Sequence, residues 1–216
     1  MREKDKLVLI GYSGHGYVAA ETIIAEDDEI TGYCDREKKD LNPYGLRYLG
    51  SEEREEVLQV IGEYAFHIGI GDNNIREKVF LRLSKLSQAR FHTAVHPSAV
   101  IASTAEVGTG VLIAAGAIVN PLASIGKGVI CNTGSIIEHE CRVEDFAHIA
   151  PGAVLAGNVT VGKKSFIGAN AVIKQGVTIG KKVTVGAGSV ILRNIPDGAV
   201  VVGNPGRPLV NRKFKK

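Results

Sequence analysis

His139 and Glu140 are adjacent in the sequence and form the pair of side chains best suited to acid–base chemistry. An imidazole exchanges protons near neutral pH, and a neighbouring carboxylate raises its basicity. Asn132 precedes the pair and His148 follows it. Spacing alone leaves two interpretations open, a general base with its carboxylate partner or a surface ion pair.

A six-residue repeat carries these residues. From Val95 to Ile191 every sixth residue is branched aliphatic or cysteine, and the residue four positions later is small or β-branched. This period matches neither the period of about 3.6 residues of a helix nor the alternation of a simple strand. It predicts a parallel β-helix of about six coils, in which each hexapeptide contributes one short strand and one corner.

Corner residues of such a coil project outward, so His139 and Glu140 are expected to reach solvent or a neighbouring subunit. The position directly after the inward residue is usually Gly or Ala, but in several repeats it holds larger polar residues, namely Asn120, Asn132, Glu138 and Glu144. We expect these residues to form one polar band on one side of the β-helix, together with both histidines.

The N-terminal part has the pattern of a small α/β domain. A buried strand at 6–10 leads into the glycine-rich turn Gly11–Gly16 and a helix at 17–25, strands follow at 30–34 and 65–70, and a helix follows at 75–87. Free N–H groups at a helix N-terminus bind anions, and Asp35 stands where ribose-binding carboxylates follow the second strand. The glycine order differs from the dinucleotide pattern, which favours a nucleotide or nucleotide sugar over NAD. The alternative, that the turn needs glycine only for its backbone geometry and binds no ligand, stays open.

These patterns divide the chain into a Rossmann-like α/β domain at 1–92 and a β-helix domain with a C-terminal tail at 93–216. The net charge of +3 and a single basic cluster at 207–216 argue against a nucleic-acid partner. No apolar run is long enough to span a membrane, and no signal peptide is visible. Three cysteines without metal-binding spacing suit a reducing compartment, so we expect a cytoplasmic protein.

The stretch Asn132–Cys141, with His148 and Gly157–Gly162 after it, resembles the bacterial sugar O-/N-acyltransferases with hexapeptide repeats. The resemblance extends to the turn Gly11–Gly16 and to Val202–Pro205. This family includes UDP-4-amino-sugar N-acetyltransferases and sialic acid O-acetyltransferase-like proteins of surface glycan biosynthesis. The resemblance implies a left-handed β-helix and an enzyme that uses acetyl-CoA as co-substrate. It also implies a homotrimer, with the nucleotide-linked sugar held by the N-terminal domain.

The resemblance implies a role for each matching residue. His139 would be the general base, Glu140 would raise its basicity and Asn132 would position it. Acetyl-CoA would contact residues of the β-helix, namely His148, Ala169 and Ala187. The nucleotide sugar would contact residues of the N-terminal domain, namely Ser13, Gly14, His15, Asp35, Arg36 and Gly71. Transfer would be direct, without an acyl-enzyme, because Cys131 and Cys141 occupy inward positions and cannot act as nucleophiles. No metal would be needed.

Three alternatives remain at this stage. The acceptor could be a hydroxyl of a sialic acid or related sugar. A hexapeptide carbonic anhydrase would hold zinc on three histidines, but His96, His139 and His148 lack close ligand spacing. A non-catalytic nucleotide-sugar-binding protein would lack the His–Glu pair, which is present here. The sugar, the nucleotide, the acyl chain and the pathway are left open by the sequence.

Overall fold

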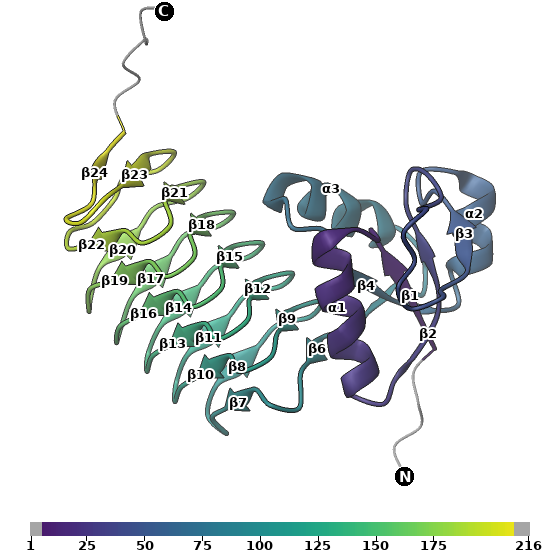
Figure 1. Ribbon diagram of the computed structural model, residues 1–216, viewed down its shortest axis with the longest axis horizontal. Coiled ribbons are helices and arrows are strands. Elements are labelled where there is room, and N and C mark those ends of the chain that lie inside the picture. The colour runs from purple at the N-terminus through teal and green to yellow at the C-terminus, as the bar shows by residue number, and fades with distance from the viewer. Residues whose placement is uncertain (1–5, 210–216) are drawn as a thin grey trace, which may run out of the picture.

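The computed structural model describes residues 6–209, which form an α/β domain at one end of an elongated β-helix (Figure 1). The α/β domain contains one parallel sheet with the strand order β3-β2-β1-β4-β5. Its elements are β1 (Lys6–Ile10), α1 (Gly14–Ala25), β2 (Glu29–Cys34), β3 (Tyr48–Gly50), α2 (Glu55–Ile61), β4 (Ala65–Ile68), α3 (Asn73–Leu83) and β5 (Arg90–Phe91).

Most predicted elements of this domain are confirmed, with shifted boundaries. Helix α1 begins at Gly14, inside the glycine-rich turn, and α3 covers Asn73–Leu83 instead of 75–87. The side chain of Asp72 caps α3 by accepting hydrogen bonds from two backbone N–H groups, which explains the earlier start. Strands β3 and β5 and helix α2 were not predicted.

The β-helix consists of two-residue strands in three parallel sheets, as the hexapeptide period predicts, and this is the architecture of the left-handed parallel β-helix. The strands are β6 (Ala94–Val95), β7 (Val100–Ile101), β8 (Glu106–Val107), β9 (Leu112–Ile113), β10 (Ile118–Val119), β11 (Ser124–Ile125), β12 (Ile130–Cys131), β13 (Ile136–Ile137), β14 (Arg142–Val143), β15 (His148–Ile149), β16 (Val154–Leu155), β17 (Thr160–Val161), β18 (Phe166–Ile167), β19 (Val172–Ile173), β20 (Thr178–Ile179), β21 (Thr184–Val185), β22 (Val190–Ile191), β23 (Val200–Val202) and β24 (Arg207–Pro208). The second residue of each strand from β6 to β22 points into one continuous apolar core.

We name the three faces by their strands: sheet 1 contains β6 and β12, sheet 2 contains β7 and β13, and sheet 3 contains β8 and β14. The first edge joins sheet 1 to sheet 2, the second edge joins sheet 2 to sheet 3, and the third edge joins sheet 3 to the next strand of sheet 1. Residues 18 apart therefore stack, as Ile118 does on Ile136. Residues 6 or 12 apart lie on different faces.

This geometry shows that the predicted single polar band is wrong. Asn120 and Glu138 share the second edge, whereas Asn132 lies on the first edge and Glu144 on the third. These four residues share a position in the hexapeptide only because each of them follows an inward residue. Which face they occupy depends on the 18-residue period of a full coil.

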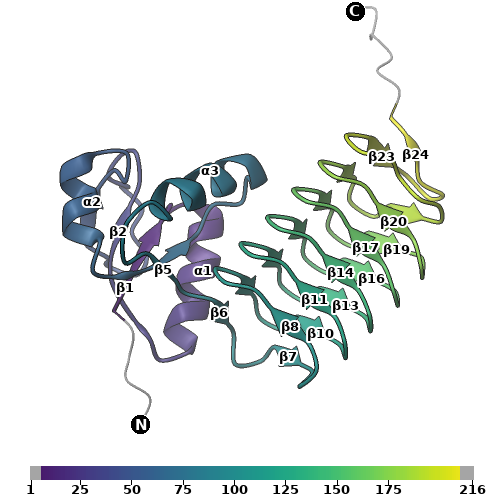
Figure 2. The same ribbon diagram turned by 180° about the vertical axis from the view of Figure 1, so that it is seen from behind.

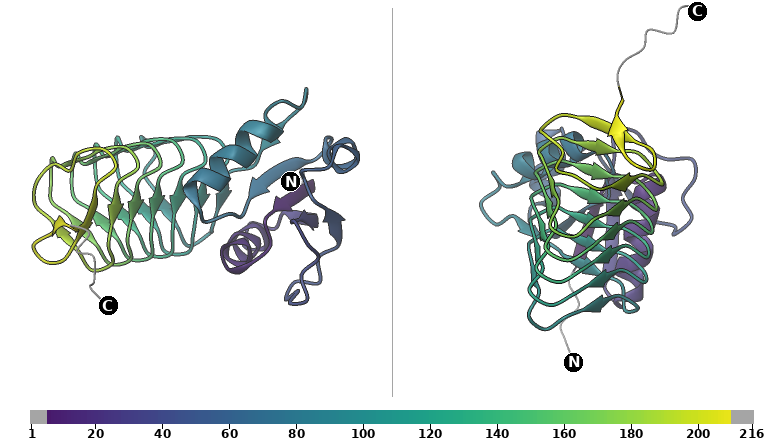
Figure 3. Two further views of the ribbon diagram at one scale, coloured as in Figure 1. Left: turned by 90° about the horizontal axis from the view of Figure 1, so that it is seen from above. Right: turned by 90° about the vertical axis from the view of Figure 1, so that its left-hand side faces the viewer.

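The α/β domain packs against sheet 1 near the first coils, with α1 and α3 closest to it (Figures 1 and 2). The outward residues of the first strands of sheet 1 are apolar, and Ala94, Leu112 and Ile130 share a buried cluster with Leu7 and Tyr12. The two domains therefore share part of their cores. Views from above and along the axis show the same arrangement (Figure 3).

Arg76 of α3 fixes this arrangement at the third edge. The residue is 1% exposed, and its guanidinium donates hydrogen bonds to the carbonyl oxygens of Gly128 (2.7 Å), Phe146 (2.9 Å) and Gly71 (3.0 Å). Burial lowers the pKa of Arg76 to about 9. The buried guanidinium of Arg76 therefore holds α3, and the segment at Gly71 that precedes α3, on the β-helix.

Within residues 6–209, none of the helices has the length and apolar character that a membrane span requires.

Candidate active site

His139 and Glu140 occupy a turn of the second edge and contact each other there. His139 Nδ1 lies 3.0 Å from Glu140 Oε2, and their side chains are 50% and 57% exposed. The carboxylate can only accept, so Nδ1 carries the proton and the lone pair of Nε2 is left free. The predicted outward placement of the pair is confirmed, and Nε2 is the atom able to accept a proton.

Glu140 has a left-handed backbone conformation, with φ +60°. Equivalent turns of the same edge also have positive φ, at Leu122, Asn158 and Gly176. The turn therefore demands a conformation that suits glycine or asparagine better than glutamate. Glutamate at this position has a conformational cost and supplies a carboxylate to His139.

His148 lies on sheet 1, at the boundary with the α/β domain, with both ring nitrogens occupied. Thr133 N donates to Asn132 Oδ1 at 2.8 Å, which turns the Asn132 amide nitrogen toward His148 Nε2 at 3.1 Å. His148 Nδ1 faces the Gly71 carbonyl oxygen at 3.4 Å. Nε2 thus accepts and Nδ1 donates, which fits a neutral ring.

The expected contact between Asn132 and His139 is absent within one chain. Asn132 lies on the first edge beside His148, whereas His139 lies on the second edge. Burial, followed by the charge of Arg76, lowers the pKa of His148 to about 4. His148 is therefore a neutral hydrogen-bonding group near neutral pH, and a weaker base than an ordinary histidine.

His15 belongs to the same boundary, and its ring centroid lies 5.7 Å from that of His148. Burial, followed by the nearby His148 and Arg76, lowers the pKa of His15 to about 3. Its Nε2 is buried and forms no hydrogen bond with the described residues. The family resemblance implies that His15 contacts the nucleotide sugar, and the structure presents a neutral ring nitrogen that can pair with a ligand.

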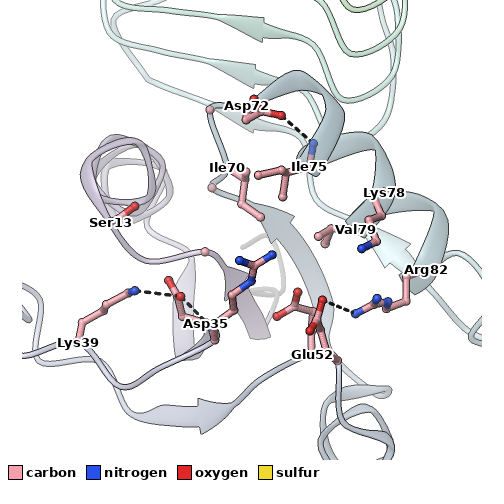
Figure 4. Close-up of a pocket in the computed structure, with 15 residues that line it drawn as sticks. Ser13, Asp35, Lys39, Glu52, Ile70, Asp72, Ile75, Lys78, Val79 and Arg82 are labelled. Atoms are coloured by element: carbon pink, nitrogen blue, oxygen red, sulfur yellow. Dashed lines mark hydrogen bonds and ion pairs between the residues drawn. The ribbon is translucent and has the colours of Figure 1, made fainter.

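A pocket of about 390 Å³ lies at the carboxyl ends of β1 and β4, where the strand order of the sheet reverses (Figure 4). This is the general ligand position of open α/β sheets. Its lining includes four predicted residues, Ser13, Asp35, Arg36 and Gly71. Gly14 and His15 adjoin Ser13 in the chain but do not line the pocket.

The N-terminus of α1 lies at this pocket, because its N-cap residue Ser13 lines the pocket wall. Ser13 makes no capping hydrogen bond with its side chain, and α1 has no acidic residue in its first turn. Backbone N–H groups at this helix end are therefore suited to phosphate.

Asp35 is held in place by Tyr12 N, which donates to Oδ2 at 3.0 Å, and by Lys39 Nζ, 2.9 Å from Oδ1. Other lining residues were not identified from the sequence, namely Lys39, Glu52, Glu53, Ile75, Lys78, Val79 and Arg82. Glu52 and Glu53 follow the unpredicted strand β3, so no sequence signal pointed to them.

Ala169 and Ala187 stack on the first edge, the edge that also carries Asn132, and Gly188 N donates to the Ala169 carbonyl oxygen at 2.8 Å. Cys131 and Cys141 are buried, as their inward positions predict. Burial raises the pKa of Cys131 to about 12.

Among the described residues, the one group of potential metal ligands that converges is Glu26, Asp28 and His92, away from the pocket and from His139. His96, His139 and His148 lie on the first edge, the second edge and sheet 1, so they do not form a common site within one chain.

Two family models match the chain: the PglD N-terminal domain at residues 6–83 and the hexapeptide repeat of succinyl-transferase at residues 152–193. A curated relative is the UDP-N-acetylbacillosamine N-acetyltransferase of Bacillus subtilis (strain 168), 34% identical over 111 residues. This match covers 50% of the chain and 51% of that protein, so the chain aligns with about half the length of the curated relative.

Two similar solved structures match over nearly the whole chain. The acetyltransferase domain of PglB from Neisseria gonorrhoeae FA1090, in complex with acetyl coenzyme A, is 34% identical with a TM-score of 0.89, covering 96% of this chain and 100% of that one. A histidine-to-asparagine mutant of perosamine N-acetyltransferase from Caulobacter crescentus, in complex with CoA and GDP-perosamine, is 32% identical with a TM-score of 0.91, covering 95% of this chain and 97% of that one.

Proposed function

The chain belongs to the PglD-like family of sugar N-acetyltransferases with hexapeptide repeats, and from this premise we propose that it acetylates the amino group of a nucleotide-linked amino sugar with acetyl-CoA. We assign His139 as the general base because Glu140 holds its Nδ1 atom while its Nε2 atom is free to accept a proton. We place the reaction in the cytoplasm, where acetyl-CoA is available, and in surface glycan biosynthesis.

The reaction is a direct transfer. The amine of the sugar attacks the thioester carbonyl carbon, and His139 Nε2 accepts the amine proton as the new C–N bond forms. The C–S bond then breaks, and the proton passes from the imidazolium to the departing thiolate of CoA. Glu140 stabilises the imidazolium between these two proton transfers.

The nucleotide occupies the pocket of the α/β domain. Its phosphates face the first turn of α1, next to Ser13 and Gly14, and Asp35 accepts hydrogen bonds from the ribose. Arg36 adds a positive charge at the wall of the pocket. The sugar extends past Gly71 toward the free Nε2 of His15.

The active site is shared between two copies of the chain. The α/β domain covers sheet 1, and the second edge, which carries His139, is the edge opposite that face. A nucleotide sugar in the pocket therefore meets the His139 of another copy. A closed ring of three chains, a homotrimer, gives each pocket one such histidine. The pantetheine arm of acetyl-CoA then runs along the first edge, past His148, Ala169 and Ala187.

The test is acetylation by the purified protein of a panel of UDP-, GDP- and dTDP-linked amino sugars, with product mass as the readout. His139→Ala is expected to lower kcat by about 10²–10⁴-fold with little change in acetyl-CoA affinity. Acetylation of hydroxyl sugars alone would contradict the amine assignment. A His139→Ala variant with more than about half of wild-type activity would contradict the base assignment.

A further inference from the structure

The nucleotide pocket is polar at both ends and apolar along one wall. Ser13 and the N-terminus of α1 lie at one end, Asp35 lies along the side, and Glu52 and Arg82 lie at the other end (Figure 4). Ile75 and Val79 of α3 supply the apolar wall. If the phosphates lie at α1 and the ribose at Asp35, the nucleobase reaches the end that contains Glu52.

Glu52 is an unusual residue for the end of a pocket. It is 7% exposed, and no other residue in the described part of the chain donates a hydrogen bond to its carboxylate. Burial raises the pKa of Glu52. The charges of Glu53 and Asp35 strengthen this shift, and the backbone N–H of Glu52 and the charge of Arg82 weaken it. A mostly buried carboxylate at the wall of a pocket is stabilised by a ligand that donates hydrogen bonds to it.

We propose, on the basis of the function proposed above, that Glu52 recognises guanine and that the acceptor substrate is a GDP-linked amino sugar. Guanine presents two adjacent donors, N1–H and the N2 amino group, which match the two oxygens of a carboxylate. Uracil and thymine present one donor between two carbonyl oxygens, and those oxygens would face the carboxylate charge.

The cations of α3 complete the guanine pattern. Arg82 and Lys78 line the same end of the pocket, and Arg82 Nη1 lies 3.3 Å from Glu53 Oε1. The Arg82 Nη1 atom is buried and makes no hydrogen bond of good geometry within residues 6–209. It can donate to the guanine O6 atom, which lies next to N1–H. The apolar side chains of Ile75 and Val79 can pack against the face of the base.

The wild-type protein provides the first test, by calorimetric titration with GDP, UDP, dTDP and IDP. GDP is expected to bind at least about tenfold more tightly than UDP or dTDP. IDP keeps N1–H and O6 but lacks the N2 amino group, so it should bind about tenfold more weakly than GDP.

The second test uses Glu52→Gln, which removes one acceptor and leaves the shape of the side chain. This change should weaken GDP binding by about 10–100-fold. It should not weaken UDP binding, because it removes the negative charge that faces the uracil oxygens. Glu56→Gln is the matched control, because Glu56 is exposed on α2 and does not line the pocket. Thermal melting of each variant checks that the fold is retained.

The outcomes separate this inference from the proposed function. Tighter binding of UDP or dTDP than of GDP, or equal binding of GDP and IDP, would overturn the guanine assignment and leave the acetyltransferase function standing. No binding of any of the four nucleotides would overturn both.

Discussion

The position of the His139 ring depends on a glycine in the next coil. The ring packs against Gly157, where an added Cβ would lie only 2.5 Å from His139 Cε1 and 2.6 Å from Nε2. The backbone of Gly157 does not need glycine for its φ angle. The absence of a side chain at position 157 therefore serves the imidazole.

We predict that Gly157→Ala displaces the His139 ring and lowers kcat by about tenfold or more, while the melting temperature changes little. Gln175 occupies the equivalent position one coil later and is exposed. Gln175→Ala is therefore the control and should leave kcat unchanged. Steady-state kinetics that give the same kcat for both variants would show that the ring is not positioned by Gly157.

Glu140 should show a trade between stability and activity. Its φ of +60° favours glycine, so Glu140→Gly is expected to stabilise the fold by about 1 kcal/mol. The same change removes the carboxylate from His139 Nδ1 and should lower kcat, by less than the loss of His139 itself. Chemical denaturation and kinetics on one preparation measure both effects. An active variant with lower stability would contradict both parts.

The sequence identified His139 and Glu140 because the repeat alone determines which positions point outward. It could not identify the contact between Asn132 and His148, because that contact depends on an 18-residue coil and on which face the α/β domain covers. Glu52 was missed for a different reason. It carries no motif, and its importance comes only from burial beside the pocket.

Helix α3 connects the two domains through the ion pairs of Glu77 as well as through the hydrogen bonds of Arg76. Glu77 lies 2.6 Å from the Nζ atoms of both Lys163 and Lys164. Burial alone would raise the pKa of Glu77, but the hydrogen bonds from the two lysines outweigh it and hold the pKa below its ordinary value. The ionised carboxylate is therefore favoured in the folded state.

A carboxylate with a lowered pKa stabilises the fold above its unfolded pKa, and this contribution is lost as the pH falls through the folded value. We predict that Glu77→Gln lowers the free energy of unfolding by about 1 kcal/mol at neutral pH. The difference from wild type should shrink as the pH falls through the lowered folded-state pKa of Glu77. Denaturation at several pH values measures it, with exposed Glu55→Gln as the control. A difference that persists unchanged in acid would show that the ion pair is not its source.

Long periodic elements were predictable, and short ones were not. The inward residues of β6 to β22 were predicted individually, because an inward side chain recurs every six positions without interruption. Strand β3 has only three residues and lies at the edge of its sheet, and α2 has seven. Elements of this length have too few residues to display a period, and their neighbours in the fold stabilise them.

The whole molecule places its two functional regions on opposite sides of one chain. The sequence predicted both domains, but it could not show that the α/β domain covers sheet 1 and leaves the second edge, with His139, on the opposite side. The shared core around Leu112 and Ile130 keeps the domains in this arrangement. We therefore propose that the pocket of one copy works with His139 of another.

Complementation between two inactive variants tests whether the active site is shared between copies. His139→Ala removes the base, and Gly14→Leu is expected to block the nucleotide at α1. Apart from its chain neighbours and the backbone of its own helix, a Cβ added at Gly14 meets no atom of the described residues within 4 Å, so we expect this variant to retain the fold. In randomly mixed trimers, about a quarter of the shared sites combine an intact pocket with an intact His139. We predict that the co-expressed variants recover about a quarter of wild-type acetylation, although each alone is inactive. Mixed trimers without activity would contradict a site shared between copies. They would indicate that the nucleotide pocket and His139 act within the same chain.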